Sequence, residues 1–181
     1  EYLNVFKLNK ILAEHRQDSQ SSKLAQTSAI KGMMHGFIDF IFEYDGKYYV
    51  VDYKSTHLGN DFADYNFVNL QQNNQSHFYD LQYLIYAVAL HRYLQNRLPD
   101  YDYAKHFGGV YYLYLRGMTD KDFSERDDSD SHKHSHKYAG VYFNVIKKSV
   151  LDALDNLMAD KGTSSNTGTE KGDKSGQISL F

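Results

Sequence analysis

The chain has 181 residues, 41 % of them hydrophobic, and a formal net charge of −3. These values predict one globular domain with its own core and exclude a chain that is disordered throughout. The chain has no cysteine, which excludes disulfide scaffolds and thiolate metal sites and fits a cytoplasmic protein. A stand-alone nucleic-acid-binding protein is usually basic, so the acidic balance argues against tight DNA binding by this chain alone. It does not argue against cutting DNA that a partner delivers.

Neither a membrane-spanning run nor a signal-peptide pattern is found in the sequence, so we expect no contact with a membrane. The first residue is Glu1 and not Met, so we expect a piece of a longer protein. Residues 1–8 alternate aromatic or polar with aliphatic side chains and predict a strand, and the polar residues 15–30 predict a loop.

Residues 36–54, GFIDFIFEYDGKYYVVDYK, predict a β-hairpin with Asp45-Gly46 as its two-residue turn. In that register Tyr44 pairs with Lys47, and counting back along both strands places Asp39 opposite Asp52. A bulge would break this register.

Two opposed carboxylates repel each other, because directly opposite Cβ atoms lie only about 4.5–5.5 Å apart. Such a pair is kept when a cation lies between the acids or when one acid stays protonated. Lys54 shares the face of Asp52, and two acids with a lysine suit a magnesium-dependent phosphodiesterase site. The alternative is a solvated surface cluster, but the apolar neighbours on that face, Phe37, Ile41 and Val50, indicate a half-buried site.

Residues 55–75 predict a long polar loop, and Ser76 is the expected N-cap of a helix from His77 to about Arg97. The helix is apolar nearly all round, which is typical of a buried helix. Gln82 and Tyr86 lie four residues apart on one of its faces. A buried glutamine side chain needs hydrogen-bond partners. These can be residues of the candidate site or a neighbouring backbone carbonyl.

Residues 110–117 predict a central strand, residues 141–145 a further strand, and residues 147–159 a helix. Between them, residues 119–138 have the composition of a disordered insertion. Its three histidines, His132, His134 and His136, are of a type that binds transition metals, but they also fit a flexible, solvated segment. We favour the flexible segment. We therefore expect a domain over residues 1–160, with an insertion at about 119–138 and a flexible tail over 161–181.

The order of these elements and motifs resembles the PD-(D/E)XK nuclease superfamily. Asp39 matches its first acid, Asp52-Tyr53-Lys54 its D-x-K, and Gln82-x-x-x-Tyr86 the Q-x-x-x-Y motif of its RecB-type branch. Four blocks carry a closer resemblance to the C-terminal nuclease domains of exodeoxyribonuclease V beta subunits: GFIDFIF, YYVVDYKSTHLG, YDLQYLIYAVALHRYL and DYDYAKHFGGVYYLYLRG. The resemblance implies an α/β fold, a restriction-endonuclease-like mixed β-sheet flanked by helices.

The resemblance also implies a metal-dependent deoxyribonuclease. Asp39, Asp52 and the backbone carbonyl of Tyr53 would ligate Mg2+, and Lys54 would orient the attacking water and offset charge on the phosphate. Gln82 and Tyr86 would lie beside the site, contacting DNA phosphate or holding the catalytic strands. Family members carry a further histidine ligand on a helix upstream of the first acid-bearing strand. We expect no such helix here, and we assign His35 only to the border of the site. Activity of this chain alone is therefore left open.

For the whole protein, the resemblance implies an ATP-dependent helicase part outside this chain and RecC and RecD subunits as partners at DNA ends. The terminal QISLF is similar to peptides that dock on bacterial sliding clamps, although an inert end is the default. One alternative function is a nuclease-fold module that guides DNA or contacts subunits without chemistry. Another is a metal-dependent hydrolase of a different phosphoester. The presence of Asp39, Asp52 and Lys54 favours the DNA nuclease.

Overall fold

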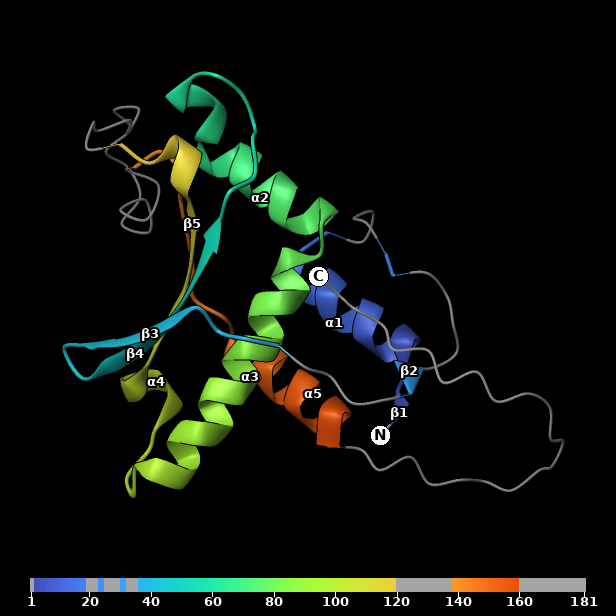
Figure 1. The fold of residues 1–181 in the computed structure, drawn as a ribbon. Coiled ribbons are helices and arrows are strands. Elements are labelled where there is room, and N and C mark those ends of the chain that lie inside the picture. Colours follow the sequence, from blue (N-terminus) through green and yellow to red (C-terminus); the bar gives the residue numbers. More distant parts are fainter. Residues whose placement is uncertain (1, 19–22, 25–29, 32–35, 120–137, 160–181) are drawn as a thin grey trace, which may run out of the picture.

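The computed structural model describes residues 2–18, 23–24, 30–31, 36–119 and 138–159 of the chain (Figure 1). The elements in chain order are β1 (Tyr2–Leu3), α1 (Val5–Arg16), β2 (Ile30–Lys31), β3 (Phe40–Tyr44), β4 (Lys47–Lys54), η1 (Phe62–Tyr65), α2 (Phe67–Ser76), α3 (Tyr79–Arg97), α4 (Tyr103–His106), β5 (Phe107–Tyr114), η2 (Leu115–Gly117), β6 (Val141–Asn144) and α5 (Lys148–Ala159).

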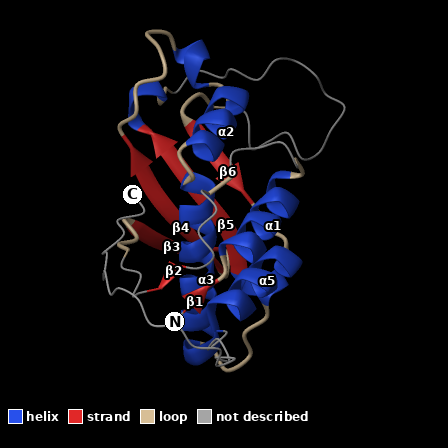
Figure 2. Cartoon of the chain, turned by 90° about the vertical axis from the view of Figure 1, so that its right-hand side faces the viewer, coloured by secondary structure: helices blue, strands red, loops and turns tan. Residues whose placement is uncertain are grey.

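The main sheet has four strands in the order β3-β4-β5-β6. The two outer pairs are antiparallel, and the central pair β4·β5 is parallel, so the sheet is mixed. The connection from β4 to β5 contains α2, α3 and α4, as a parallel pair requires a long crossover. Figures 1 and 2 show α1, α3 and α5 stacked on one face of this sheet. The fold is therefore α/β, a restriction-endonuclease-like mixed sheet with helices.

The predicted hairpin is confirmed in both its turn and its register. Asp45 and Gly46 adopt φ angles of 51° and 72°, the left-handed pair that a type I′ turn needs. Pairing runs from Tyr44↔Lys47 to Phe40↔Val51 without a bulge. The ladder stops one pair short of Asp39, which lies immediately before β3.

Helix α3 lies at the centre of the molecule and supplies much of its core. Its 19 residues include 11 buried ones, which confirms the prediction of a buried helix. The predicted central strand is also confirmed: β5 lies between β4 and β6, although it begins at Phe107 and ends at Tyr114. Strand β6 and helix α5 occur as predicted, and α5 buries Val150, Leu151, Leu154 and Leu157 against the core.

The strand predicted over residues 1–8 is wrong beyond its first residues, because α1 begins at Val5. The Asn4 side chain accepts a hydrogen bond of 3.0 Å from the Lys7 N–H and so caps this helix. The buried residues Val5, Leu8, Ile11 and Leu12 recur at helical spacing. Helix α1 continues to Arg16, inside the region predicted as a loop over residues 15–30, and Ile30–Lys31 forms the short strand β2 paired with β1.

The long loop predicted over residues 55–75 contains η1 and α2 and so is wrong in its second half. Asn66 caps α2 by accepting a hydrogen bond of 3.0 Å from the Asn69 N–H. Ser76 ends α2 and is not an N-cap, since α3 begins at Tyr79 after Phe78. Phe78 has a φ of 54°, a left-handed backbone that separates the two helices.

Several predictions lie outside the described residues. They concern His35, the histidines of the insertion at about 119–138, and the tail over 161–181 with its QISLF end. Over the residues that the structure does describe, no helix combines the length and apolar character needed to cross a membrane.

Candidate active site

The two predicted acids lie at the open end of the β3–β4 hairpin. Asp52 is on β4 with an exposed fraction of 5 %. Asp39 is exposed, and its Oδ2 accepts a hydrogen bond of 2.9 Å from the backbone N–H of Tyr53. A strand residue directs its N–H and its C=O to the same neighbouring strand, so the Tyr53 carbonyl also faces the side of Asp39. Asp39, Asp52 and this carbonyl are thus brought to one corner of the sheet.

Burial raises the pKa of Asp52 above its ordinary value. The hydrogen bond and the positive charge of Lys54 oppose this rise, and the charge of Asp39 adds to it. The effect of Asp39 places the two carboxylates within electrostatic reach of each other. A cation bound by both carboxylates would offset the repulsion between them.

The apolar surroundings expected for both acids are present only around Asp52. Val50 is fully buried, whereas Phe37 is 85 % exposed and Ile41 is 41 % exposed. The described helices cover the half of the face that carries β4 and β5, and β3 is an edge strand beyond them. Asp39 is therefore an exposed acid beside a buried one.

Lys54 extends from the end of β4 into a polar and aromatic enclosure. Its Nζ lies 2.6 Å from Oδ2 of Asp52 and donates a hydrogen bond of 2.8 Å to Oε1 of Gln82. The same Nζ lies 3.9 Å from the ring centroid of Tyr79 and 4.7 Å from that of Tyr112. The lysine side chain is only 11 % exposed, so these contacts are made largely out of water.

Gln82 joins this enclosure through three side-chain hydrogen bonds. Its Oε1 accepts a bond of 2.7 Å from the Tyr112 hydroxyl as well as the bond from Lys54. Its Nε2 donates to the Tyr86 hydroxyl at 3.2 Å. The side chain of Gln82 thus forms its hydrogen bonds with residues of the candidate site. The other partner considered from the sequence was a neighbouring backbone carbonyl.

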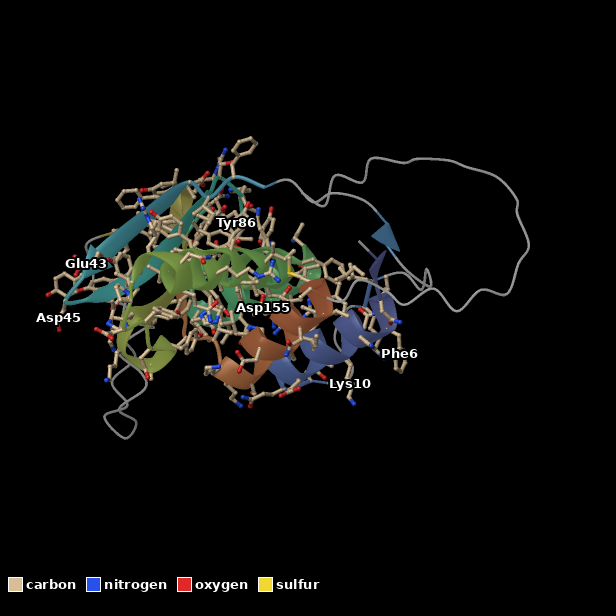
Figure 3. The ribbon with its side chains drawn as sticks, turned by 90° about the horizontal axis from the view of Figure 1, so that it is seen from below. Phe6, Lys10, Glu43, Asp45, Tyr86 and Asp155 are labelled. Carbon is tan, nitrogen blue, oxygen red and sulfur yellow. The ribbon has the colours of Figure 1, made fainter. Side chains whose placement is uncertain are left out.

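Tyr86 lies on the side of α3 that faces the hairpin, whereas Glu43 and Asp45 mark the far tip of the hairpin (Figure 3). Burial raises the pKa of the Tyr86 phenol, and the charges of Asp52 and Asp39 add to that effect. A Cβ built on Gly36 would come within 3.0 Å of the Tyr86 ring. The segment that leads to Asp39 therefore passes close to this ring.

Sequence reasoning missed Tyr79 and Tyr112 as neighbours of Lys54. Tyr112 pairs directly with Asp52 across the parallel β4·β5 ladder, so it lies on the same face of the sheet. Tyr79 precedes Gln82 by three residues and shares its face of α3. The spacing of Tyr79 and Gln82 on one helix face can be read from the sequence. The pairing of Tyr112 with Asp52 across two parallel strands cannot.

No helix was expected upstream of the first acid-bearing strand, but α1 lies there and carries His15. The structure does not bring His15 to Asp39 and Asp52. Its Nε2 lies 2.6 Å from the Tyr83 hydroxyl, and Asp80, Arg16 and Lys147 are the charges that act on it. Within the described ranges no three His, Cys, Asp or Glu side chains form a group that could hold a metal.

The donor set of the hairpin nevertheless fits a hard divalent cation. Two carboxylates and a strand carbonyl at one corner supply oxygen ligands, which Mg2+ prefers. The buried Asp52 is flanked by Lys54, which could engage a phosphate or a water next to the cation.

A family model described as the PD-(D/E)XK nuclease superfamily matches residues 5–167. The chain belongs to this superfamily. The match includes both acids, Lys54 and all of α3, so the family extends over the complete candidate site.

Curated relatives include the RecBCD enzyme subunit RecB of several bacteria. The protein from Haemophilus influenzae is 51 % identical over 120 residues, which is 66 % of this chain and 10 % of that protein. The proteins from Escherichia coli and Borreliella burgdorferi are 42 % and 33 % identical, each over 72 % of this chain and 10 % of the relative. The chain therefore spans about a tenth of the length of these relatives.

Proposed function

We propose that this chain is a nuclease domain that hydrolyses DNA phosphodiester bonds with a divalent metal ion, preferentially Mg2+. The observation that carries the proposal is the buried Asp52, held at 2.6 Å from Lys54 with Asp39 at the open end of the same hairpin. The family supports nuclease chemistry, and the oxygen donors support a hard cation.

Asp39, Asp52 and the Tyr53 carbonyl are the proposed metal ligands. A bound Mg2+ would supply Lewis-acid stabilisation of the phosphate and a more acidic water. Lys54 donates from its ammonium to the attacking water or to a phosphate oxygen and offsets the charge that develops there. Gln82 fixes the position of Lys54 through Oε1, and Tyr86 supports Gln82 and lies beneath the chain that leads to Asp39.

We further propose that the whole protein is a RecB subunit that acts in the cytoplasm with RecC and RecD in DNA recombination and repair. The relatives are named as RecBCD enzyme subunits, which supports this assembly. ATP would serve only a helicase part outside this chain. We also propose a single domain over residues 1–160, and the family match over residues 5–167 supports most of this range.

The test compares Asp52→Asn with Asp45→Asn in the full-length protein assembled with its partner subunits. Asp45 is an exposed turn residue of the same hairpin, and asparagine tolerates its left-handed backbone. We expect Asp52→Asn to lower the rate of cleavage of linear duplex DNA by about 100-fold or more. Asp45→Asn should retain cleavage, and both variants should retain DNA unwinding. Cleavage by Asp52→Asn at the rate of Asp45→Asn would refute the site and favour a module that only guides DNA.

A further inference from the structure

We propose that Tyr79 is a positioning residue that holds the Lys54 ammonium in place when a cation occupies Asp52. The contact itself is a property of the chain, and its consequence for catalysis rests on the proposed function. The Nζ of Lys54 lies 3.9 Å from the Tyr79 ring centroid, closer than the 4.7 Å that separates it from Tyr112. An ammonium this close to a ring face is attracted by the ring quadrupole, and the attraction is larger out of water.

The need for this contact comes from the double role of Asp52. Among the residues that the structure describes, Asp52 is the charged partner of Lys54, with Oδ2 and Nζ 2.6 Å apart. A divalent cation on Asp52 would neutralise that carboxylate and repel the ammonium. Lysine has a flexible four-carbon stem, so a repelled ammonium can move away from the reacting phosphate.

Two kinds of partner remain for Lys54 after a cation has bound. Oε1 of Gln82 is neutral and is shared with the Tyr112 hydroxyl. The rings of Tyr79 and Tyr112 keep their quadrupoles whatever the charge state of Asp52. Tyr79 therefore supplies an attraction that does not compete with the metal for Asp52.

The position of the Tyr79 ring is itself well defined. Tyr79 is the first residue of α3, and the left-handed backbone of Phe78 sets the direction in which the helix starts. Its ring stacks on His77, with centroids 5.5 Å apart and an interplanar angle of 21°. It also contacts Tyr112, with centroids 6.2 Å apart. A ring held on two sides can restrain Lys54 at little entropic cost.

The first experiment measures the metal-free chain by NMR. Protons on Cε of Lys54 lie near a ring face, so they should be shifted upfield, and Lys54→Arg identifies their signal. Tyr79→Leu should remove most of this shift, whereas Tyr79→Phe should keep it because the ring remains. Tyr93→Leu is the matched control, since Tyr93 lies on the same helix beneath a different cation, the Arg97 guanidinium, at 5.8 Å. An unchanged Lys54 signal in Tyr79→Leu would overturn the proposal, and so would an equal loss in Tyr79→Phe.

The second experiment repeats the NMR measurement with Mg2+ and measures cleavage in the assembled enzyme. With Mg2+, Lys54 should keep its upfield signal in the wild type and in Tyr79→Phe. Cleavage by Tyr79→Leu should show a kcat lower by about 10-fold with an unchanged KM for DNA. Unchanged kcat in Tyr79→Leu, while Asp52→Asn is inactive, would overturn this inference but leave the nuclease site standing. Full activity of Asp52→Asn would instead refute the nuclease site itself.

Discussion

The backbone N–H of Tyr53 donates a hydrogen bond of 2.9 Å to Oδ2 of Asp39. Strand β3 begins one residue later, at Phe40, so the carboxylate takes the place of a backbone acceptor at the end of the ladder. This bond anchors an exposed acid to the strand that carries the buried Asp52. The two acids are thus held close together. Burial is the main cause of the raised pKa of Asp52, and the charge of Asp39 adds to it.

We predict that Asp39→Asn lowers the pKa of Asp52 in the metal-free protein. Asparagine can still accept the Tyr53 hydrogen bond, but it removes the like charge that adds to the rise. A raised pKa in the folded state means that stability is lost as the pH increases through that pKa. Asp39→Asn should therefore raise the free energy of unfolding near neutral pH, by less than about 1 kcal/mol.

The carboxyl carbon of Asp52, followed by NMR against pH, measures the first effect, and urea denaturation measures the second. Glu43→Gln is the control, because Glu43 is an exposed acid at the far end of β3 whose bond to the Gly46 N–H a glutamine can keep. An Asp52 pKa that is equal in Asp39→Asn and wild type would show that the acids do not interact.

Gln82→Ala should destabilise the domain by about 1–3 kcal/mol without unfolding it. The substitution leaves the Tyr112 hydroxyl and the Lys54 ammonium without their shared acceptor. Turnover should fall by more than this stability loss explains, because Lys54 is no longer held. Urea denaturation and DNA cleavage measure the two effects, with Gln95→Ala, at an exposed position of α3, as the control. A collapsed fold would mean that the role of Gln82 is structural.

His15 should make the stability of the protein depend on pH. Burial is the largest cause that lowers the pKa of His15, from 6.5 to about 4. Between these values the unfolded chain binds a proton that the folded protein does not, so stability falls as the pH decreases from 6.5 towards 4. The loss due to His15 should reach about 3 kcal/mol, and His15→Gln should remove it.

The measurement is the free energy of unfolding at a series of pH values, compared between wild type and His15→Gln. His57→Gln changes an exposed histidine and is the control. All other titrating groups are common to wild type and His15→Gln, so the difference between these two curves isolates His15. Parallel curves for wild type and His15→Gln would contradict the burial assigned to this ring.

The backbone at Phe78 should favour glycine over alanine. Phe78 has a φ of 54°, and an L-residue in this region costs about 1–2 kcal/mol. Phe78→Ala and Phe78→Gly both remove the ring over which the Arg16 guanidinium lies at 5.4 Å, so their difference reports on the backbone. We expect Phe78→Gly to be the more stable of the two by about 1 kcal/mol.

Ala89→Gly, at an exposed position inside α3, is the opposite control for Phe78. Glycine should destabilise the helix there by about 1 kcal/mol. Thermal or urea denaturation of the three variants measures these differences in stability. If Phe78→Gly is less stable than Phe78→Ala, the left-handed start of α3 is not present in solution.

The hairpin could be predicted because its information is local. Asp45-Gly46 suits one turn type, and that turn sets the register of every pair up to Phe40↔Val51. The contact of Lys54 with Asp52 follows from strand alternation in the same way. The family motifs then supplied Gln82, which contacts Lys54, and Tyr86, which contacts Gln82; no local pattern gives these contacts.

The errors occurred where short windows or tertiary contacts decide the structure. Residues 1–8 alternate well enough for a strand, and the helical spacing of Leu8, Ile11 and Leu12 is clear only over a longer window. Helix α2 is mostly polar, burying only Leu70 and Asn74, so its sequence lacks an apolar stripe. Tyr112 reaches Lys54 across a parallel pair whose register is set by the crossover through α3, which sequence spacing does not reveal.

The proposed nuclease chemistry requires that Asp39 and Asp52 form a site for a divalent cation. Calorimetric titration of Mn2+, a surrogate for Mg2+, into the wild-type chain, Asp52→Asn and Asp45→Asn tests it most directly. We expect binding by the wild type and by Asp45→Asn, and loss of that binding in Asp52→Asn. Equal Mn2+ binding by Asp52→Asn and wild type would contradict it, as would a wild-type chain that shows no binding.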